Sequence, residues 1–255
     1  MFLSIIIPTL NEEKYLPKLL ESLQKQEVDF SYEVIIADAG SFDGTLEVAR
    51  NFGKKIVSGG LPAVGRNRGA EVAEGKIFLF LDADVVLPEK NFLKESLKEF
   101  FQRNLDVASF YIVPENKIDR FFYKFYNLYS KLTQNFLPHA TCGAILVKKE
   151  VHKKINGFDE EVKFAEDHFY VREAKKFKAK FGILNKKIFT SSRRFEKDGR
   201  LNTYLKYVIA EFYMIFFGPI KKELFSYQFG NWSFRKSVKK INFLKKLKER
   251  VLRAF

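Results

Sequence analysis

Short apolar runs alternate with amphipathic segments through the first half of the chain, and this alternation constrains the fold more than any other feature. The apolar runs predict strands, and the segments with leucines at helical spacing predict helices. Strands that alternate with helices form a mostly parallel sheet covered by helices on both faces. The sequence therefore predicts an α/β, Rossmann-like fold with strands at 2–8, 33–38, 55–58, 76–81 and 106–113 and helices at 14–26, 45–52, 63–74 and 89–103.

Beyond Pro114 the pattern changes, because aromatic residues dominate two predicted helices at 118–136 and 204–217. Both carry more apolar side chains than one core-facing stripe requires. The second is shorter than the roughly 20 residues that cross a bilayer, so we expect no transmembrane helix there. Shorter elements are predicted between them: strands at 144–148, 181–184 and 188–190, and a helix at 165–177.

The chain is strongly basic, with 45 Lys and Arg against 31 Asp and Glu, a formal net charge of +14. Much of this excess lies in residues 231–255, where Glu249 is the only acid among nine basic residues, Arg235, Lys236, Lys239, Lys240, Lys245, Lys246, Lys248, Arg250 and Arg253. Apolar residues recur there at spacings of three and four. The pattern is typical of a cationic amphipathic helix at a membrane surface, although the same stripe could dock onto the domain.

Cys142 is the only cysteine, which rules out an internal disulfide and suits a reducing compartment. The apolar run at 2–8 is too short for a signal-peptide core and lacks a basic leader. We therefore expect a cytoplasmic protein, peripheral on the inner face of the membrane where the basic tail contacts lipid.

Polar and acidic residues follow three of the predicted strands, namely Glu12, Asp38 and the pair Asp82 and Asp84. Ligands of open parallel sheets bind beyond the carboxyl ends of the strands. Two carboxylates two residues apart in an extended chain point to the same side and repel, so a cation is expected between them. Oxygen ligands suit Mg²⁺ or Mn²⁺, and such an ion would neutralise a departing diphosphate. Asp43 is predicted to be a turn or cap residue instead.

Other candidates lie near predicted helix starts. Arg66 begins a helix and suits a diphosphate. Glu166 and Asp167 either supply a general base or simply complement a helix dipole. The pair at 193–194 either contributes positive charge to a diphosphate or forms a solvated basic turn, and His139 is predicted to be structural.

Together these motifs resemble family 2 glycosyltransferases of GT-A fold. The resemblance covers roughly residues 1–195 and is carried by the segments 4–13, 38–45, 65–70, 79–84, 156–160 and 165–168. It implies a nucleotide-sugar donor linked to UDP or GDP, a glycan or lipid-linked acceptor, and inversion at the anomeric carbon. Many members have two consecutive acids where this chain has Asp38 and Ala39, which leaves recognition of the base less defined.

The resemblance also implies roles for individual residues. Asp167 would be the catalytic base, Asp84 the main metal ligand, and Asp82 a neighbour of the ribose or sugar. The donor-binding residues would be Pro8, Thr9, Glu12, Asp38, Arg66, Asp82, Ala83 and Asp84. Further contacts to acceptor or diphosphate would come from Glu166, His168, Arg193 and Arg194.

The expected organisation is a GT-A domain at 1–200, with a nucleotide-sugar half at 1–113 and an acceptor half at 114–200, followed by aromatic and basic amphipathic helices at 201–255. Three alternatives compete with an active transferase. A nucleic-acid-binding module would leave the acidic strand ends unexplained, so we expect no nucleic-acid partner. A sugar-nucleotide nucleotidyltransferase would have a basic, glycine-rich loop after the first strand. A catalytically inactive relative that binds a partner is disfavoured by the retained acids.

Overall fold

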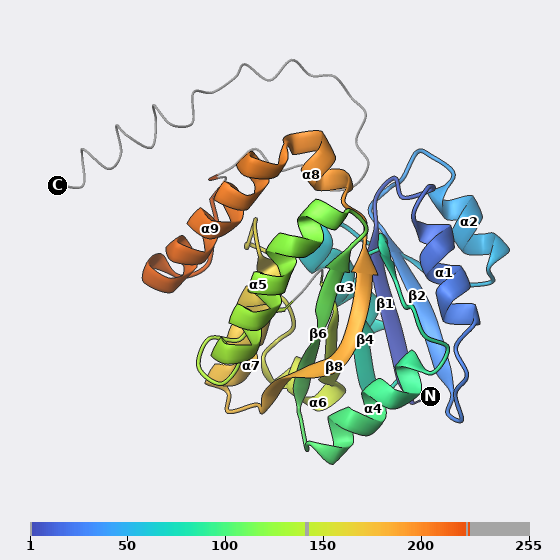
Figure 1. Ribbon diagram of the computed structural model, residues 1–255. Helices are drawn as coiled ribbons and strands as arrows, with labels where there is room; N and C mark the ends of the chain where they lie inside the picture. The colour runs from blue at the N-terminus through green and yellow to red at the C-terminus, as the bar shows by residue number, and fades with distance from the viewer. Residues whose placement is uncertain (1, 141–142, 223, 225–255) are drawn as a thin grey trace.

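The structure is a computed structural model in which residues 2–140, 143–222 and 224 are described (Figure 1). Within these residues, eight strands form one sheet in the order β3-β2-β1-β4-β7-β6-β8-β5. Strands β7 and β5 run antiparallel to their neighbours and the rest are parallel to one another, so the sheet is mostly parallel as predicted. The strands are β1 (Leu3–Thr9), β2 (Tyr32–Asp38), β3 (Lys55–Ser58), β4 (Ile77–Phe80), β5 (Val85–Val86), β6 (Val107–Pro114), β7 (Ile145–Lys148) and β8 (Phe181–Thr190).

Helices cover both faces of the sheet because the central strands are apolar on both sides. Ile5 and Ile7 of β1 pack toward α1, α2 and α4, while Ile6 packs toward α3 and α7. These helices are α1 (Leu16–Gln24), α2 (Thr45–Asn51), α3 (Pro62–Glu71), α4 (Phe92–Gln102) and α7 (Glu166–Lys176).

Helix α3 lies unusually close to β1, and two glycines explain this. A Cβ on Gly69 would overlap the Ile6 side chain, and a Cβ on Gly65 would press against Pro8. The close approach brings Arg66, on the same turn, to the carboxyl end of β1.

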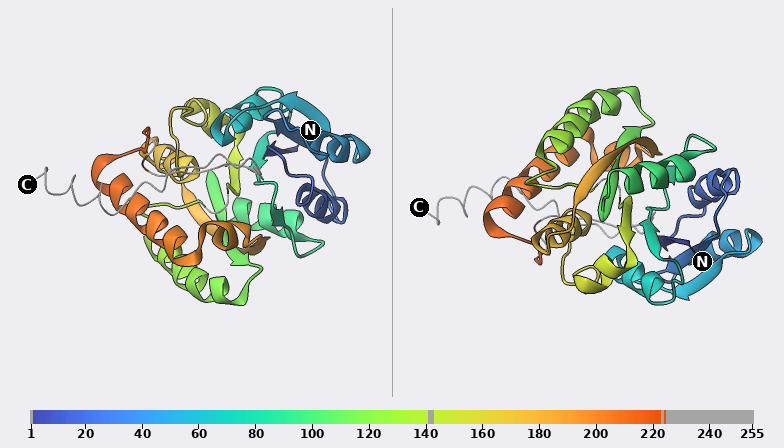
Figure 2. Two further views of the ribbon diagram at one scale, coloured as in Figure 1. Left: turned by 90° about the horizontal axis from the view of Figure 1, so that it is seen from above. Right: turned by 90° about the horizontal axis from the view of Figure 1, so that it is seen from below.

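Of the remaining helices, α5 and α9 run beside each other in all three views (Figures 1 and 2). These remaining helices are α5 (Lys117–Thr133), α6 (Lys149–Lys154), α8 (Arg193–Asp198) and α9 (Arg200–Phe217). Helix α9 contacts the body through a small apolar cluster of Ala210 and Met214 with Phe164 and Ile220. None of the helices in the described part of the chain is long and apolar enough to span a bilayer.

The structure corrects several local expectations. The strand predicted at 76–81 ends at Phe80, so Asp82 and Asp84 lie in a turn and the argument from extended geometry does not apply to them. The two strands predicted at 181–184 and 188–190 are one, β8, which shifts register against β6. Helices α6 and α8 and strand β5 were not predicted. The basic segment at 231–255 lies outside the described residues.

Candidate active site

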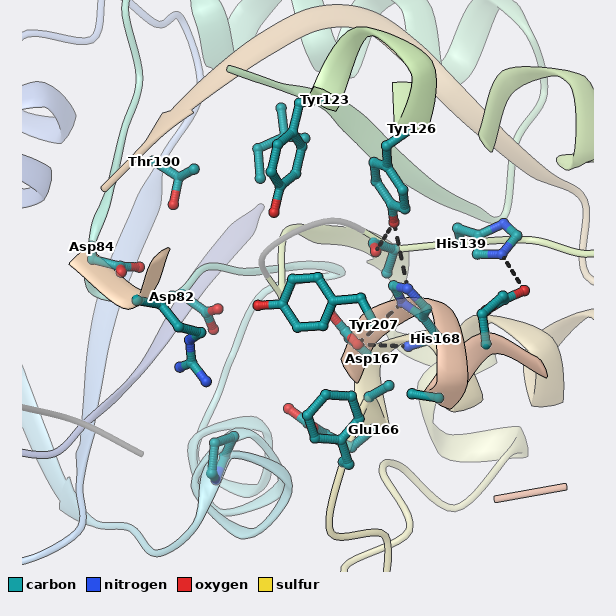
Figure 3. Close-up of a pocket in the computed structure, with 18 of the residues that line it drawn as sticks. Asp82, Asp84, Tyr123, Tyr126, His139, Glu166, Asp167, His168, Thr190 and Tyr207 are labelled. Carbon is teal, nitrogen blue, oxygen red and sulfur yellow. Dashed lines mark hydrogen bonds and ion pairs between the residues drawn. The ribbon is translucent and has the colours of Figure 1, made fainter. Parts of the chain in front are cut away.

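A cavity of about 830 Å³ opens beyond the carboxyl ends of β1 and β4 (Figure 3). It has a polar end beside the strand ends and an apolar end between α5 and α9. With the exception of Asp38, every site residue predicted from the sequence lines it: Pro8, Thr9, Glu12, Arg66, Asp82, Ala83, Asp84, Glu166, Asp167, His168, Arg193 and Arg194. Pro8 and Arg194, which are 186 positions apart in sequence, therefore line the same cavity.

Asp38 is buried beside the cavity and does not line it. Its carboxylate accepts hydrogen bonds from the Thr9 hydroxyl at 2.8 Å, from the Gly40 N–H at 2.9 Å, and from the N–H and hydroxyl of Ser41 at 2.8 and 2.6 Å. These bonds occupy the lone pairs of the carboxylate. Asp38 thus fixes the loop after β2 and orients Thr9, which does line the cavity.

Arg66 is a buried cross-link at the base of the cavity, with only 1% of its surface exposed. Its Nη1 donates to Glu166 Oε1 at 2.6 Å and its Nη2 to Asp82 Oδ1 at 2.7 Å. Its guanidinium also lies over the Phe158 ring, 5.2 Å from the centroid. A buried charge requires such partners, so in this structure Arg66 joins the strand-end acids to the start of α7.

The chain beside Arg66 leaves no space for a side chain. A Cβ on Gly143 would overlap both the Arg66 guanidinium and the Asp82 carboxylate, and the residue has a φ of +60°. Both facts require glycine.

Asp82 is held in an environment that disfavours its charged form. Burial is the largest cause and raises the pKa of Asp82 to about 7, although Arg66 opposes the shift. The nearby carboxylates of Asp84 and Asp167 raise it further. Acidic groups with raised pKa values are a mark of functional sites.

Arg193, at the start of α8, closes the polar end of the cavity. Its Nη1 and Nη2 donate to the two oxygens of Glu12 at 2.6 and 2.7 Å, and its Nε donates to Asp84 Oδ2 at 3.0 Å. The guanidinium also stacks on Tyr15, 4.3 Å from the ring centroid. Burial raises the pKa of Glu12 to about 7 despite this arginine. Arg193 is therefore paired with acids at the cavity and is not part of a solvated turn, while its contact with a diphosphate stays a prediction.

Asp82 and Asp84 are the residues that the sequence predicts to bind a divalent metal ion. Among the described residues, no group of three His, Cys, Asp or Glu side chains is arranged to hold a metal ion. Mg²⁺ and Mn²⁺ commonly use one or two carboxylates together with waters and substrate phosphates. Asp84 lines the cavity and already binds a cationic group through Oδ2, so the residues fit an ion that arrives with a diphosphate.

Asp167 lies at the start of α7 and faces the middle of the cavity (Figure 3). Its Oδ1 accepts the backbone N–H of His168 at 2.8 Å, and its Oδ2 accepts the N–H of Gly143 at 3.2 Å. Burial opposes ionisation, but His168, Arg66 and the Gly143 N–H outweigh it and hold the pKa of Asp167 below its usual value. The carboxylate is ionised at neutral pH. In the view of Figure 3 the Tyr207 ring is drawn between Asp167 and Asp82.

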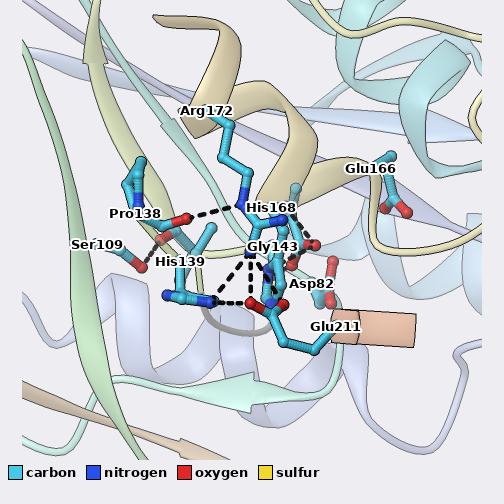
Figure 4. Close-up of polar contacts among 12 residues, drawn as sticks. Asp82, Ser109, Pro138, His139, Gly143, Glu166, His168, Arg172 and Glu211 are labelled. Carbon is cyan, nitrogen blue, oxygen red and sulfur yellow. Dashed lines mark hydrogen bonds and ion pairs between the residues drawn. The ribbon is translucent and has the colours of Figure 1, made fainter. Parts of the chain in front are cut away.

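A polar network that sequence reasoning missed lies behind His168 (Figure 4). Glu211 of α9 accepts from Arg172 Nη2 at 2.9 Å on both oxygens, and its Oε1 lies 2.9 Å from His139 Nε2. The Tyr129 hydroxyl also donates to it at 3.2 Å. One signal was present in the sequence, because Glu211 is the only acid in the apolar segment 200–217. The contacts of His139 join α9 to the body, and its side chain also lines the cavity, so its structural role stays a prediction.

The model of the family described as "Glycosyl transferase family 2" matches residues 4–155, which is more than half of the chain. The chain therefore belongs to glycosyl transferase family 2. This agrees with the resemblance seen in the sequence and with the GT-A fold of the structure.

Individual relatives extend the comparison. The poly(ribitol-phosphate) beta-N-acetylglucosaminyltransferase TarS of Staphylococcus aureus is 26% identical over 222 residues, which are 80% of this chain and 38% of TarS. A dolichyl N-acetyl-alpha-D-glucosaminyl phosphate glycosyltransferase of Methanococcus voltae is 37% identical over 112 residues, 40% of this chain and 34% of that protein. The chain thus spans less than half the length of these relatives.

Solved structures give the same fold. The S. aureus TarS 1–349 structure in complex with UDP-GlcNAc matches with a TM-score of 0.59 at 25% identity, over 75% of this chain and 59% of that one. The mannosyltransferase PcManGT of Pyrobaculum calidifontis, in complex with GDP-Man and Mn²⁺, matches with a TM-score of 0.62 at 18% identity, over 81% and 64%. The second likeness concerns the fold alone.

Proposed function

We propose that this protein transfers a sugar from a nucleoside diphosphate donor to an acceptor hydroxyl or phosphate, with inversion at the anomeric carbon. One observation carries the proposal: the aspartates that follow β4 and the ionised Asp167 at the start of α7 line the same cavity. The aspartates after β4 suit the diphosphate of a donor, and Asp167 suits the nucleophilic group of an acceptor.

The donor is expected at the polar end of the cavity. Pro8 and Thr9, at the end of β1, together with Glu12 and Ala83, form walls for the nucleoside. Relatives of this fold were solved with UDP-GlcNAc and with GDP-Man and Mn²⁺. A UDP- or GDP-linked sugar is accordingly the proposed donor, and these comparisons leave the sugar open.

Asp84 would be the main ligand of a bound Mg²⁺ or Mn²⁺, with Asp82 beside it. Such an ion neutralises the negative charge of the diphosphate as the glycosidic bond breaks. Arg193 contributes fixed positive charge at the same place, because its guanidinium is already 3.0 Å from Asp84. Arg66 keeps Asp82 and Glu166 in position through its two ion pairs.

Asp167 would act as the base. It would accept the proton of an acceptor hydroxyl while the acceptor oxygen attacks the anomeric carbon from the face opposite the diphosphate. The oxygen–carbon bond forms, the carbon–diphosphate bond breaks, and the proton passes to the Asp167 carboxylate. A phosphate acceptor is already ionised and needs no such transfer.

The acceptor is proposed to be a glycan or a lipid-linked group, since curated relatives include a poly(ribitol-phosphate) and a dolichyl-phosphate-linked transferase. A cytoplasmic protein that contacts the membrane through the basic segment 231–255 would fit this role. That contact rests on sequence composition alone.

Calorimetric titration of UDP and GDP, each with and without Mn²⁺, tests the donor site. We expect metal-dependent binding of one nucleotide that Asp84→Ala abolishes. Asp29→Ala is the matched control, because Asp29 pairs with Lys94 on the surface and does not line the cavity. If neither nucleotide binds under any metal condition, the proposed donor site is wrong.

A further inference from the structure

Helix α5 exposes its apolar side to solvent and turns its polar side toward the protein. Ile118, Phe121, Phe125, Leu128 and Leu132 recur every three or four residues along it, and each is more than half exposed. The side that faces the protein is polar and includes the buried residues Asp119, Ser130 and Thr133. A surface helix normally buries its apolar stripe and exposes its polar one.

Helix α9 has the same inverted character. Leu201, Leu205, Val208, Phe212 and Phe216 are each half or more exposed, up to 74% for Leu201. The residues buried against the body are Thr203, Ala210 and Met214. Two neighbouring helices that both expose their apolar sides form a patch larger than soluble monomers usually leave uncovered.

The groove between the two helices continues into the candidate active site. Phe122, Phe125 and Tyr129 of α5 and Tyr204, Val208 and Phe212 of α9 line the apolar end of the same cavity that contains Asp84 and Asp167. The rings of Phe122 and Tyr204 lie 4.5 Å apart and connect the two helices at one end of the groove. An apolar chain lying in the groove would thus have its head group directed to Asp167.

Charge on the two helices indicates what covers this face. Their acids, Asp119 and Glu211, point inward and are paired with Arg200 and Arg172 respectively. The remaining charged side chains of α5 and α9 are basic: Lys117, Arg120, Lys124, Lys131 and Lys206. The segment 231–255, with nine basic residues and one acid, carries positive charge like these helices. A second molecule of this chain would present the same positive charge. Both are repelled, whereas an anionic bilayer is attracted.

We propose that α5 and α9 form the face with which this protein docks on an anionic membrane, and that the groove between them admits the hydrocarbon chain of a lipid. Exposed phenylalanines and leucines enter the boundary between headgroups and acyl chains, and the lysines contact lipid phosphates. The identification of this lipid as the sugar acceptor rests on the proposed function. The docking on a membrane is independent of it.

The test is sedimentation of the full chain with vesicles of phosphatidylcholine, with and without phosphatidylglycerol. The face variant is Phe121→Glu with Leu205→Glu, which places two charges on the outer side of the helices without altering the cavity lining. The matched control is Phe101→Glu with Phe177→Glu, since these phenylalanines are 47% and 45% exposed on other elements. We expect the wild type to prefer phosphatidylglycerol vesicles, the face variant to bind at least about tenfold less, and the control to bind like wild type.

Equal binding of wild type and face variant would overturn the proposal and would move membrane contact to another part of the chain. Binding that does not distinguish the two vesicle types would also overturn it, because the charge argument would fail. A wild-type dimer in light scattering, dissociated by the face variant and without vesicle binding, would identify a second copy as the occupant. Nucleotide calorimetry on the same variants separates this result from a failure of the donor site.

Discussion

At the scale of single residues, the site is a set of acids held together by two arginines. Arg66 joins Asp82 to Glu166, and Arg193 joins Glu12 to Asp84. Each guanidinium compensates two carboxylates that would otherwise repel one another at close range. The arginines thus hold the acids at the strand ends in place before any ligand arrives, although burial still raises the pKa of Asp82 and of Glu12 to about 7.

Asp167→Asn tests the base. The amide keeps the shape of the side chain and cannot accept a proton, so we expect nucleotide binding to remain within a few-fold of wild type. Transfer should fall by about 10² to 10⁴, the range that a general base contributes. The measurement is release of nucleoside diphosphate from the donor that binds in calorimetry, and NMR of the product establishes the anomeric configuration.

Asp29→Asn serves as the control, because its partner Lys94 is also on the surface. Transfer by Asp167→Asn within about tenfold of wild type would assign the base elsewhere, or would indicate a phosphate acceptor that needs none. An inactive wild type that still binds nucleotide would support the alternative of a relative that binds without catalysis.

At the scale of elements, α6 and α7 pack against the sheet around a titratable side chain, the imidazole of His152. His152 is buried among Phe80, Phe158 and Tyr170, and its Nδ1 lies 2.9 Å from the Tyr170 hydroxyl. Burial lowers the pKa of His152 to about 4. The folded state therefore keeps the imidazole neutral, while the unfolded chain takes up a proton below its ordinary pKa of about 6.5.

The stability contributed by neutral His152 is complete above pH 6.5 and is lost as the pH falls toward 4. Between pH 7.5 and pH 5 this group should lower the free energy of unfolding by about 2 kcal/mol. His152→Gln retains a hydrogen-bonding group and does not titrate. Urea unfolding of both proteins at each pH should show a smaller pH dependence for the variant, and parallel curves would contradict the assignment.

The elements of the first half could be predicted from sequence, because their apolar periodicity is local. The sheet class and the helices from α1 to α4 follow from that pattern. The candidate residues, twelve of which line one cavity, came instead from the motifs at strand and helix ends and from the family resemblance. The ion pairs could not be predicted, since Arg193 and Glu12 are 181 residues apart. The stripe on α5 was recognised, but hydrophobic periodicity cannot tell an inward stripe from an outward one.

At the scale of the whole molecule, α9 buries few of its residues against the rest of the protein. Its buried residues are Thr203, Ala210 and Met214, and its outer side packs on nothing among the described residues that would bury it. Two acids make its polar connections. Asp119 of α5 pairs with Arg200 at the start of α9. Glu211 of α9 meets Arg172 of α7, His139 of the preceding loop and Tyr129 of α5. This carboxylate therefore holds together three segments that form the apolar end of the cavity.

Glu211→Gln should lower the free energy of unfolding in urea by about 3 kcal/mol, because it leaves the Arg172 guanidinium buried without a counter-ion. Burial alone would raise the pKa of Glu211, but His139 and Arg172 hold it below its usual value, so the charged form is the one being lost. The double variant Arg172→Met with Glu211→Leu removes both charges and should recover part of that loss. A double variant no more stable than Glu211→Gln would show that the cost comes from lost packing, and that α9 is held by its apolar cluster instead.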